Sequence, residues 1–211
     1  MSRALILGLG LAGIAADAGA ADFRSLDVSR QGDSYQVQAV VYLAAPPQAV
    51  YAVLTDYDHF TRITASVVES RKLQQLDPAT ALVYTDTRVC VLFYCRHLKE
   101  MQRIAATPPA DITSQVLAEK SDNVKSGSAL LHMEAEGEGT LLHWQLSLEP
   151  GFWVPPLIGP PLLERSLKSE GRRSATGVEK LARERAHLPP LDSTENHGKN
   201  EDPGKGGANG G

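Results

Sequence analysis

The 211-residue chain carries 21 lysine and arginine residues against 25 aspartate and glutamate residues, and its net charge at pH 7 is −4. Proteins that bind nucleic acid usually present a concentrated basic face, so this charge balance argues against a nucleic-acid partner. The sequence also lacks a Gly-rich phosphate-binding loop, a Cys-x-x-Cys pair and an internal repeat, which excludes the classes of protein that these motifs mark.

Residues 1–20 have the layout of a secretory signal peptide. A basic residue precedes an uncharged apolar stretch from Ala4 to Ala16, and the segment that ends at Ala20 has the small-x-small pattern of a cleavage site. A membrane anchor is the alternative, but about 13 helical residues span only about 20 Å of a hydrocarbon core that is ~30 Å thick. We therefore expect cleavage after Ala20 and a periplasmic or secreted protein.

The mature chain opens with a lead-in, residues 21–34, before the first predicted strand. Tyr35 to Leu43 predicts a strand because β-branched and aromatic residues dominate it. Pro46-Pro47 ends that strand, since proline donates no hydrogen bond to a sheet and suits the first turn of a helix. Two short helical pieces follow, at about 48–54 and 56–63.

A run of strand signals separated by turn residues fills the middle of the chain. The strands are expected at about 66–75, 80–90, 95–105, 112–119, 126–136 and 140–149. Their short connections favour antiparallel neighbours, so the sequence predicts a meander.

A long amphipathic helix is predicted from Leu162 to about Arg185. Its apolar face is formed by Leu163, Leu167, Ser174, Val178 and Leu181. Residues 187–211 supply almost no apolar side chains, so we expect them to form a disordered tail. The predicted domain therefore spans residues 35–186, and its fold class is α+β, with a curved sheet closed by one helix.

This order of elements resembles the helix-grip fold of the START-like superfamily, which includes polyketide cyclases/dehydrases and lipid transport proteins. The segment Val41–Tyr51 looks like its opening strand and helix, and Tyr57–Phe60 looks like the piece that follows. Trp153–Pro160 is similar to the lead into the final helix of bacterial coenzyme Q-binding START-domain proteins. The resemblance implies an antiparallel sheet wrapped around a long C-terminal helix, with an internal cavity for a lipid or a quinone.

Alternation along the last two strands predicts which side chains face the interior. The expected ligand-lining residues are Leu131, Met133, Leu142, Trp144 and Leu146. The opposite parity turns His132 and His143 toward solvent. An ordinary filled core explains the same pattern, so the expectation of a cavity depends on the resemblance.

Two predicted connections are unusually apolar, although connections normally meet water. The residues concerned are Phe93 in the connection at 91–94, and Phe152, Trp153 and Leu157 in the connector at 150–157. In a meander both connections lie at the same end of the sheet as the polar loop at about 120–126. They indicate a cavity mouth, a rim that touches a membrane, a partner site, or a hydrophobic plug over the open end of the sheet.

Cys90 and Cys95 flank the first of these apolar connections. In a tight hairpin they occupy facing positions, where Cα atoms about 4.5 Å apart are within reach of a disulfide. Export to an oxidising compartment favours the bond. The spacing is not that of a redox-active pair, so we expect a structural disulfide; two buried free thiols are the alternative.

Catalytic residues are not indicated by the sequence. The candidate acid–base groups are His59, His97, His132, His143, Asp56, Asp58, Asp86 and Glu100. Asp86 and Arg88 share one face of a strand, and on an inward face they would form a paired charge able to orient a polar head group. No catalytic triad, carboxylate pair or metal-ligand spacing stands out, so we assign no catalytic residue, metal or cofactor.

The sequence thus predicts an exported protein that binds or carries a hydrophobic small molecule, a lipid or a quinone, with transient membrane contact. Two alternatives remain open. One is a cyclase or hydratase that acts on an apolar substrate in the same cavity, and the other is an interaction protein that docks a membrane partner through its apolar connections.

Overall fold

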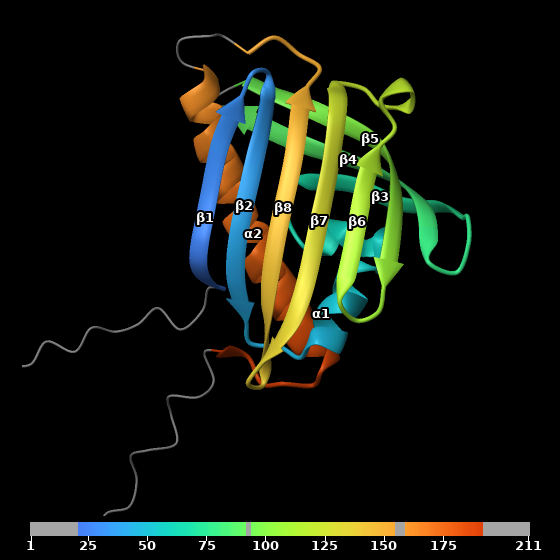
Figure 1. Cartoon of the computed structure of the whole chain (residues 1–211), viewed down its shortest axis with the longest axis vertical. Helices are drawn as coiled ribbons and strands as arrows, with labels where there is room; N and C mark the ends of the chain where they lie inside the picture. Colours follow the sequence, from blue (N-terminus) through green and yellow to red (C-terminus); the bar gives the residue numbers. More distant parts are fainter. Residues whose placement is uncertain (1–20, 92–93, 155–158, 192–211) are drawn as a thin grey trace, which may run out of the picture.

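The computed structural model describes residues 21–91, 94–154 and 159–191 (Figure 1). The predicted signal peptide, most of the predicted tail, and the expected site residues Phe93 and Leu157 lie outside the described residues. Within the described ranges, no helix combines the length and the apolar character needed to cross a bilayer.

The chain alternates strands and short helices before its long final helix. The elements are β1 (Asp22–Gln31), β2 (Ser34–Leu43), α1 (Pro47–Leu54), the 3-10 helix η1 (Tyr57–Arg62), β3 (Val67–Gln75), β4 (Thr80–Val91), β5 (Tyr94–Thr107), β6 (Asp111–Val116), the 3-10 helix η2 (Ala118–Lys120), β7 (Val124–Glu136), β8 (Gly139–Pro150) and α2 (Gly159–Arg185). The strands form an eight-stranded antiparallel sheet in the order β1-β2-β8-β7-β6-β5-β4-β3. The expected α+β helix-grip fold is confirmed.

The lead-in at 21–34 contains a strand that the sequence pattern did not reveal. Residues Asp22–Gln31 pair with β2 along its whole length, and the two strands turn at Gly32, whose φ is +62°. Glycine suits this turn because it adopts positive φ at little cost. A register shift between Phe23 and Ser25 interrupts the alternation of β1, and this interruption hid the strand from a pattern of period two.

The helical interruption after β2 determines the topology of the sheet. Strands β3 to β8 form the predicted meander, and β2 lies beside β8 rather than beside β3. The segment that contains α1 and η1 therefore carries the chain from β2, the second strand of the sheet, to β3 at the opposite edge. Pro46 and Pro47 begin this change of direction, because Pro46 precedes the first turn of α1 and Pro47 occupies it.

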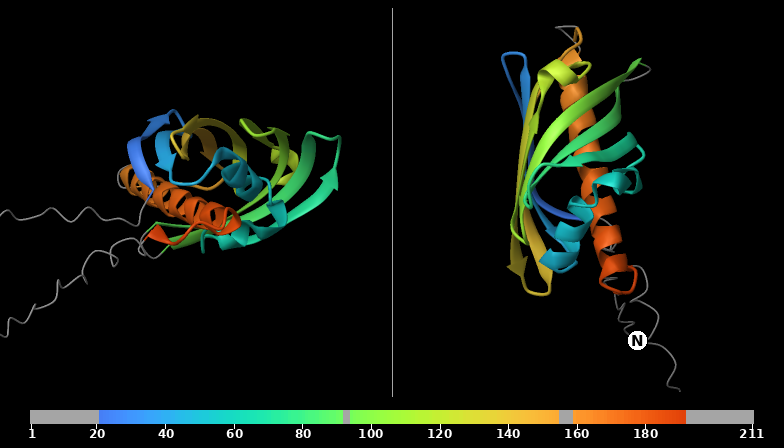
Figure 2. Two further views of the ribbon diagram at one scale, coloured as in Figure 1. Left: turned by 90° about the horizontal axis from the view of Figure 1, so that it is seen from below. Right: turned by 90° about the vertical axis from the view of Figure 1, so that its right-hand side faces the viewer.

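The sheet curves around α2, which lies along its concave side (Figure 2). The helix buries Leu163, Ala175, Val178 and Ala182. Leu163 and Val178 belong to the face that the sequence predicted, whereas its other members, Leu167, Ser174 and Leu181, are half-buried, because the buried stripe is shifted toward Ala175 and Ala182. Facing them are the inward side chains of β2, including Val41 and Leu43. Apolar burial between the two layers forms the main core.

Polar bonds fasten the C-terminal half of α2 to the turn after β2. The backbone N–H of Ala44 donates to Glu179 Oε1 at 2.6 Å, and Arg183 Nη1 donates to the Ala44 carbonyl at 2.5 Å. Burial raises the pKa of Glu179, and the Ala44 bond and the charge of Arg183 oppose that shift. These contacts set the distance between helix and sheet at the end where α1 begins.

Candidate ligand-binding cavity

An apolar cavity of about 240 Å³ lies between the sheet, η1 and α2. Its lining consists of Leu54, Phe60, Ile63, Val67, Ile104, Ile112, Leu131, Leu142, Trp144, Ala175 and Val178, with the polar residues Thr64, Gln102, Ser114 and Ser174. The strands contribute these residues by alternation: Ile112 and Ser114 are inward on β6, and Leu142 and Trp144 are inward on β8. The residues that enclose the space therefore come from both layers of the fold.

Of the residues on the last two strands that we expected to line a ligand site, some line the cavity and others do not. Leu131, Leu142 and Trp144 line the cavity. Met133 is buried in the core beyond it, and Leu146 is partly buried farther along β8. Neither of these two lines the cavity.

The end of the sheet near the connector after β8 holds a separate pocket of about 390 Å³. Phe152 and Trp153 line it together with Tyr35, and it shares no lining residue with the apolar cavity. Phe152 packs on Leu98, Val116, Val124 and Leu148, whereas Trp153 is 76% exposed. The two aromatic residues thus differ: Phe152 covers the end of the sheet and Trp153 faces solvent.

The small cluster beneath Phe152 separates the two pockets. Along β8, Trp144 lines the apolar cavity, Leu148 belongs to the cluster and Pro150 lines the outer pocket. The loop before β7 closes the same end, because Asn123 accepts the Gly151 N–H at 2.8 Å and donates from Nδ2 to the His97 carbonyl at 2.9 Å. A ligand that enters from this end must displace Phe152 or its neighbours.

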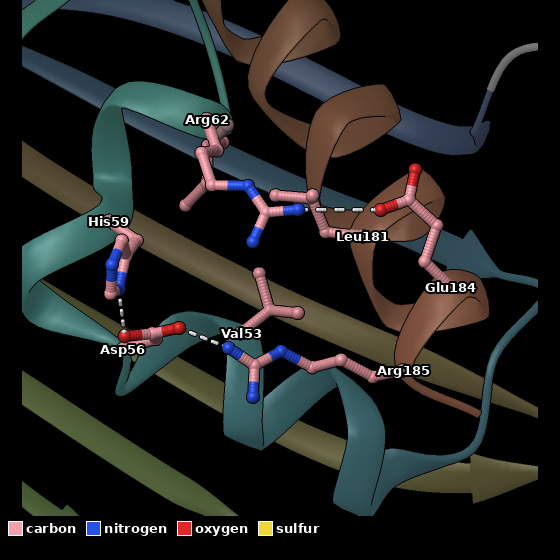
Figure 3. Close-up of a pocket in the computed structure, with 8 residues that line it drawn as sticks. Val53, Asp56, His59, Arg62, Leu181, Glu184 and Arg185 are labelled. Atoms are coloured by element: carbon pink, nitrogen blue, oxygen red, sulfur yellow. Dashed lines mark hydrogen bonds and ion pairs between the residues drawn. The ribbon is translucent and has the colours of Figure 1, made fainter. Parts of the chain in front are cut away.

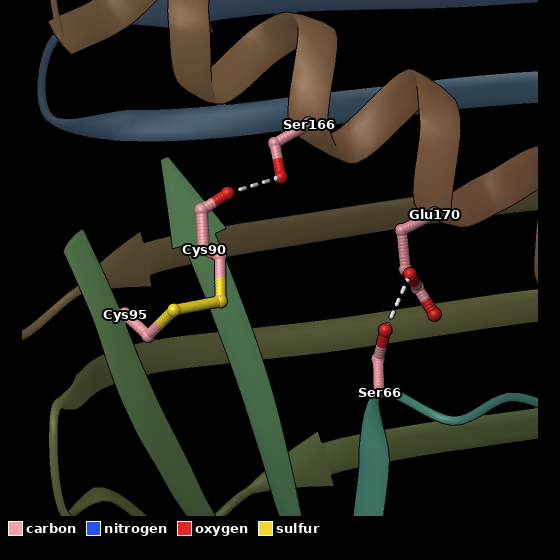
Figure 4. Close-up of a disulfide and its surroundings, with 5 residues drawn as sticks. All are labelled: Ser66, Cys90, Cys95, Ser166 and Glu170. Carbon is pink, nitrogen blue, oxygen red and sulfur yellow. Dashed lines mark hydrogen bonds between the residues drawn. A yellow bond between two sulfur atoms is a disulfide. The ribbon is translucent and has the colours of Figure 1, made fainter. Parts of the chain in front are cut away.

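A disulfide joins Cys90 and Cys95, which face each other on β4 and β5 with Cα atoms 4.0 Å apart (Figure 4). Ser166 on α2 donates from Oγ to the Cys90 carbonyl at 3.1 Å. The expected bond is therefore present, and the hairpin end that carries it is attached to the first half of α2.

A carboxyl group borders the cavity on β5. The inward positions of this strand are Leu98, Glu100, Gln102 and Ile104, and Glu100 faces Thr85 on β4. Gln102 lines the cavity and donates from Nε2 to Glu100 Oε2 at 2.8 Å, while Thr85 donates from Oγ1 to the same oxygen at 3.5 Å. A polar cluster of Glu100, Gln102 and Thr85 thus adjoins an otherwise apolar space.

Burial controls the titration of Glu100. It raises the pKa from its ordinary 4.5 to about 7, and the hydrogen bonds from Gln102 and Thr85, which favour the ionised form, offset only part of that rise. The carboxyl group therefore changes charge near neutral pH. Sequence reasoning named Glu100 as a candidate but left its direction open, and it did not select Gln102.

A second carboxylate near the cavity serves to hold the fold together. Thr64 and Ser66 donate from their hydroxyls to Glu170 on α2 at 2.8 and 2.7 Å, and Figure 4 shows the bond from Ser66. Arg173 Nη2 lies 2.7 Å from the same carboxylate. Burial pushes the pKa of Glu170 upward, but these bonds together lower it. Glu170 is ionised at neutral pH and ties the segment before β3 to the helix.

The remaining acid–base candidates lie outside the cavity. Asp86 is on the outer face of β4, where it pairs with His97 at 2.7 Å, so the condition under which Asp86 and Arg88 would form an inward pair is not met. His132 bonds Asp111 at 2.7 Å, and its ring lies 6.2 Å from that of His143 on the outer face of β7 and β8. Both histidines point away from the interior, as strand parity predicted.

Asp56 and His59 line a surface cleft of about 180 Å³ between α1, η1 and α2 (Figure 3). Asp56 bonds His59 Nδ1 at 2.7 Å and also accepts a bond from Arg185. Burial opposes ionisation of Asp56, but its partners prevail and lower its pKa. Arg62 and Glu184 form a further pair at 3.5 Å, so the charges in this cleft are matched and connect the helices.

Metal ligands are not gathered anywhere in the described ranges: no group of three or more histidine, cysteine or acidic side chains is placed to hold an ion there. The sequence analysis assigned no metal because it found no metal-ligand spacing, and that assignment stays a prediction. The chemistry that the cavity offers is therefore apolar contact with one titratable polar cluster at its border.

The family model described as "Polyketide cyclase / dehydrase and lipid transport" matches residues 34–184. A search among curated proteins found no match to the sequence. Among solved structures, the Zhui aromatase/cyclase from Streptomyces sp. R1128 is similar with a TM-score of 0.60 and 18% identity, over 72% of this chain and 96% of that one.

Two further similar structures are named for lipid transfer or for the START family. The STAR-related lipid transfer protein (fragment 25–204) from Xanthomonas axonopodis has a TM-score of 0.53 and 13% identity, over 77% of this chain and 99% of that one. Human STARD10 has a TM-score of 0.56 and 11% identity, over 82% of this chain and 76% of that one. At these identities the likeness shows the fold alone.

Proposed function

Because the chain belongs to the polyketide cyclase/dehydrase and lipid transport family, we propose that it is an exported carrier that binds a hydrophobic small molecule, a lipid or a quinone. The observation that supports this most directly is the apolar cavity between the sheet and α2. Its lining stabilises a ligand through burial of apolar surface at roughly 25 cal/mol per Å².

The size of the cavity limits how a ligand fits. About 240 Å³ is below the roughly 300–1,000 Å³ of typical ligand pockets. A complete lipid or a quinone with its tail exceeds this space. Binding therefore places one part of the ligand in the cavity or separates α2 and η1 from the sheet as the ligand enters.

Export and membrane contact belong to the same proposal. The apolar segment before Ala20 supports export, and the mass of the protein recovered from the periplasm tests it, because cleavage leaves a chain that begins at Ala21. Trp153, at 76% exposure, and Tyr94, at 50%, support contact with a membrane, since aromatic residues favour the membrane–water interface.

A cyclase or hydratase is the second candidate function, and Glu100 is the observation that favours it. A general acid or base works best when its pKa lies near the working pH, and that of Glu100 is about 7. Its hydrogen-bond partners Gln102 and Thr85 do not titrate near neutral pH, so the cluster has no second titratable group to act as the complementary acid or base. Because the cluster has no second titratable group, we rank catalysis below binding.

Native mass spectrometry of mature protein purified from its own periplasm, combined with lipid extraction, tests the carrier. We expect one lipid or quinone per chain. An empty chain that also fails to bind an apolar fluorescent probe would contradict the proposal and favour a protein that docks a partner. If purified protein converted an apolar substrate to a cyclic or hydrated product, and Glu100→Gln abolished this activity, the result would favour the enzyme.

A further inference from the structure

We infer that the cavity selects ligands whose polar end is uncharged and forms hydrogen bonds, and that it rejects ligands ending in a carboxylate, because Glu100 receives that end. The inference rests on the proposed function and names the class of ligand. It is carried by the position of Glu100 and by the arrangement of its bonds.

One carboxyl oxygen of Glu100, Oε1, is available to a ligand as a hydrogen-bond partner. Within the part of the chain that the structure describes, the two hydrogen bonds that reach Glu100, from Gln102 and Thr85, both end on Oε2. Thr85 is 5% exposed, so this side of the group is held by protein. Neither of these bonds reaches Oε1, so this oxygen can accept a bond from a ligand that extends past Gln102 while its apolar part lies against Trp144 and Leu131.

Gln102 connects Glu100 with the cavity. It lines the cavity and contacts the carboxyl oxygen at 2.8 Å and Thr85 Oγ1 at 3.2 Å. A hydroxyl that reaches this border finds an acceptor in the ionised carboxyl and a donor in the protonated one. A neutral polar end is therefore accommodated in both protonation states.

An anionic end is not accommodated once Glu100 is ionised. Arg173, which precedes the lining residue Ser174 on α2, is already bound to Glu170. The polar lining residues Thr64, Gln102, Ser114 and Ser174 carry no charge. Two carboxylates in contact inside an apolar space repel each other, and such like-charge juxtaposition weakens binding strongly. The structure thus discriminates by charge rather than by shape.

The test compares 1-decanol with decanoate as displacers of the neutral fluorescent probe N-phenyl-1-naphthylamine. The assay is made at pH 8, where a carboxyl with a pKa of about 7 is ionised. An apolar cavity of any kind prefers the alcohol, so the quantity that decides is the ratio of the two displacement constants. We expect Glu100→Gln to reduce this ratio by about tenfold or more, chiefly through tighter decanoate binding.

Glu138→Gln, in the exposed turn between β7 and β8, is the matched control and leaves the ratio unchanged. An unchanged ratio in Glu100→Gln, or an equal change in the affinity for both displacers, would overturn the inference and leave the carrier intact. If the wild-type protein binds no N-phenyl-1-naphthylamine, the proposed function fails, and the inference fails with it. Gln102→Leu provides a second variant, which we expect to weaken decanol and leave the repulsion of decanoate.

Discussion

Gly177 on α2 lies directly against the backbone of Ile63 at the end of η1. A Cβ added at Gly177 would lie 1.9 Å from the Ile63 carbonyl oxygen and 2.8 Å from its carbonyl carbon. Backbone atoms cannot move aside as a flexible side chain does. Glycine at this position therefore sets how closely η1 approaches the helix, and Ile63 in turn lines the cavity.

We expect Gly177→Ala to lower the free energy of unfolding by about 2–3 kcal/mol, as overpacked sites do, although alanine is the better helix former. Urea unfolding measures the difference. Gly171→Ala is the matched control, because its Cβ would meet side chains rather than backbone: Trp144 at 3.2 Å and Leu26 at 3.8 Å. Equal stability of the two variants would contradict the close contact.

Glu100 makes stability depend on pH. Its folded-state pKa of about 7 exceeds the ordinary 4.5, so its contribution to stability is complete below pH 4.5 and is lost as the pH rises through 7. We expect the free energy of unfolding of the wild type to fall relative to Glu100→Gln by up to about 3 kcal/mol over that range. Urea unfolding at several pH values measures it, with Glu119→Gln, on exposed η2, as control. A constant difference between wild type and Glu100→Gln would show that Glu100 is solvated.

Removal of the disulfide tests the attachment of the β4–β5 hairpin. We expect the double variant Cys90→Ser, Cys95→Ser to lose about 2 kcal/mol of unfolding free energy, since the closed ring is short and constrains the unfolded chain only modestly. Denaturant unfolding with and without a thiol reductant measures this. The reductant must destabilise the wild type and leave the variant unaffected; destabilisation of both would point to another cause.

Ser114→Leu fills the cavity from β6. Because the new side chain occupies existing space, we expect stability to be unchanged or higher, whereas the affinity for N-phenyl-1-naphthylamine falls by about tenfold or more. Thr113→Leu is the matched control, since Thr113 is exposed on the opposite face of the same strand. Undiminished binding in Ser114→Leu would place the ligand elsewhere.

Trp153→Ala tests the membrane contact. We expect transfer of a fluorescent lipid analogue between vesicles to slow severalfold, because an interfacial aromatic anchor is lost. The chain has two tryptophans, so Trp144 fluorescence in the variant still reports occupancy of the cavity. Leu73→Ala, at an exposed position on β3, is the control. Unchanged transfer in Trp153→Ala would show that Trp153 does not form the entrance through which the ligand is transferred.

Patterns of period two and 3.6 were sufficient for most of the fold. Alternation along β7 and β8 predicted that Leu131, Leu142 and Trp144 face inward, and all three line the cavity. The same alternation could not separate Met133, which packs in the filled core, from its neighbours. Whether an inward side chain meets protein or empty space depends on the layer opposite, and no strand pattern contains that information.

The polar cluster was missed for a different reason. Glu100 and Gln102 interrupt the apolar positions of β5, so alternation of apolar residues does not reveal the inward face there. Once Cys90 is paired with Cys95, counting back along the hairpin places Glu100 opposite Thr85. The Cys90–Cys95 pair therefore fixes the register of β4 against β5. That register was the signal in the sequence that could have shown which way Glu100 points.

The neighbours in the sheet differ greatly in their separation along the chain. Strands β3 to β7 each pair with the next strand along the chain, whereas Gln36 on β2 donates a hydrogen bond to Ser147 on β8, 111 residues later. Closing so long a loop costs entropy before any contact compensates for it. The β1–β2 hairpin can join the rest of the sheet only through β8. A chain synthesised from its N-terminus therefore completes its sheet only after the last strand has been made.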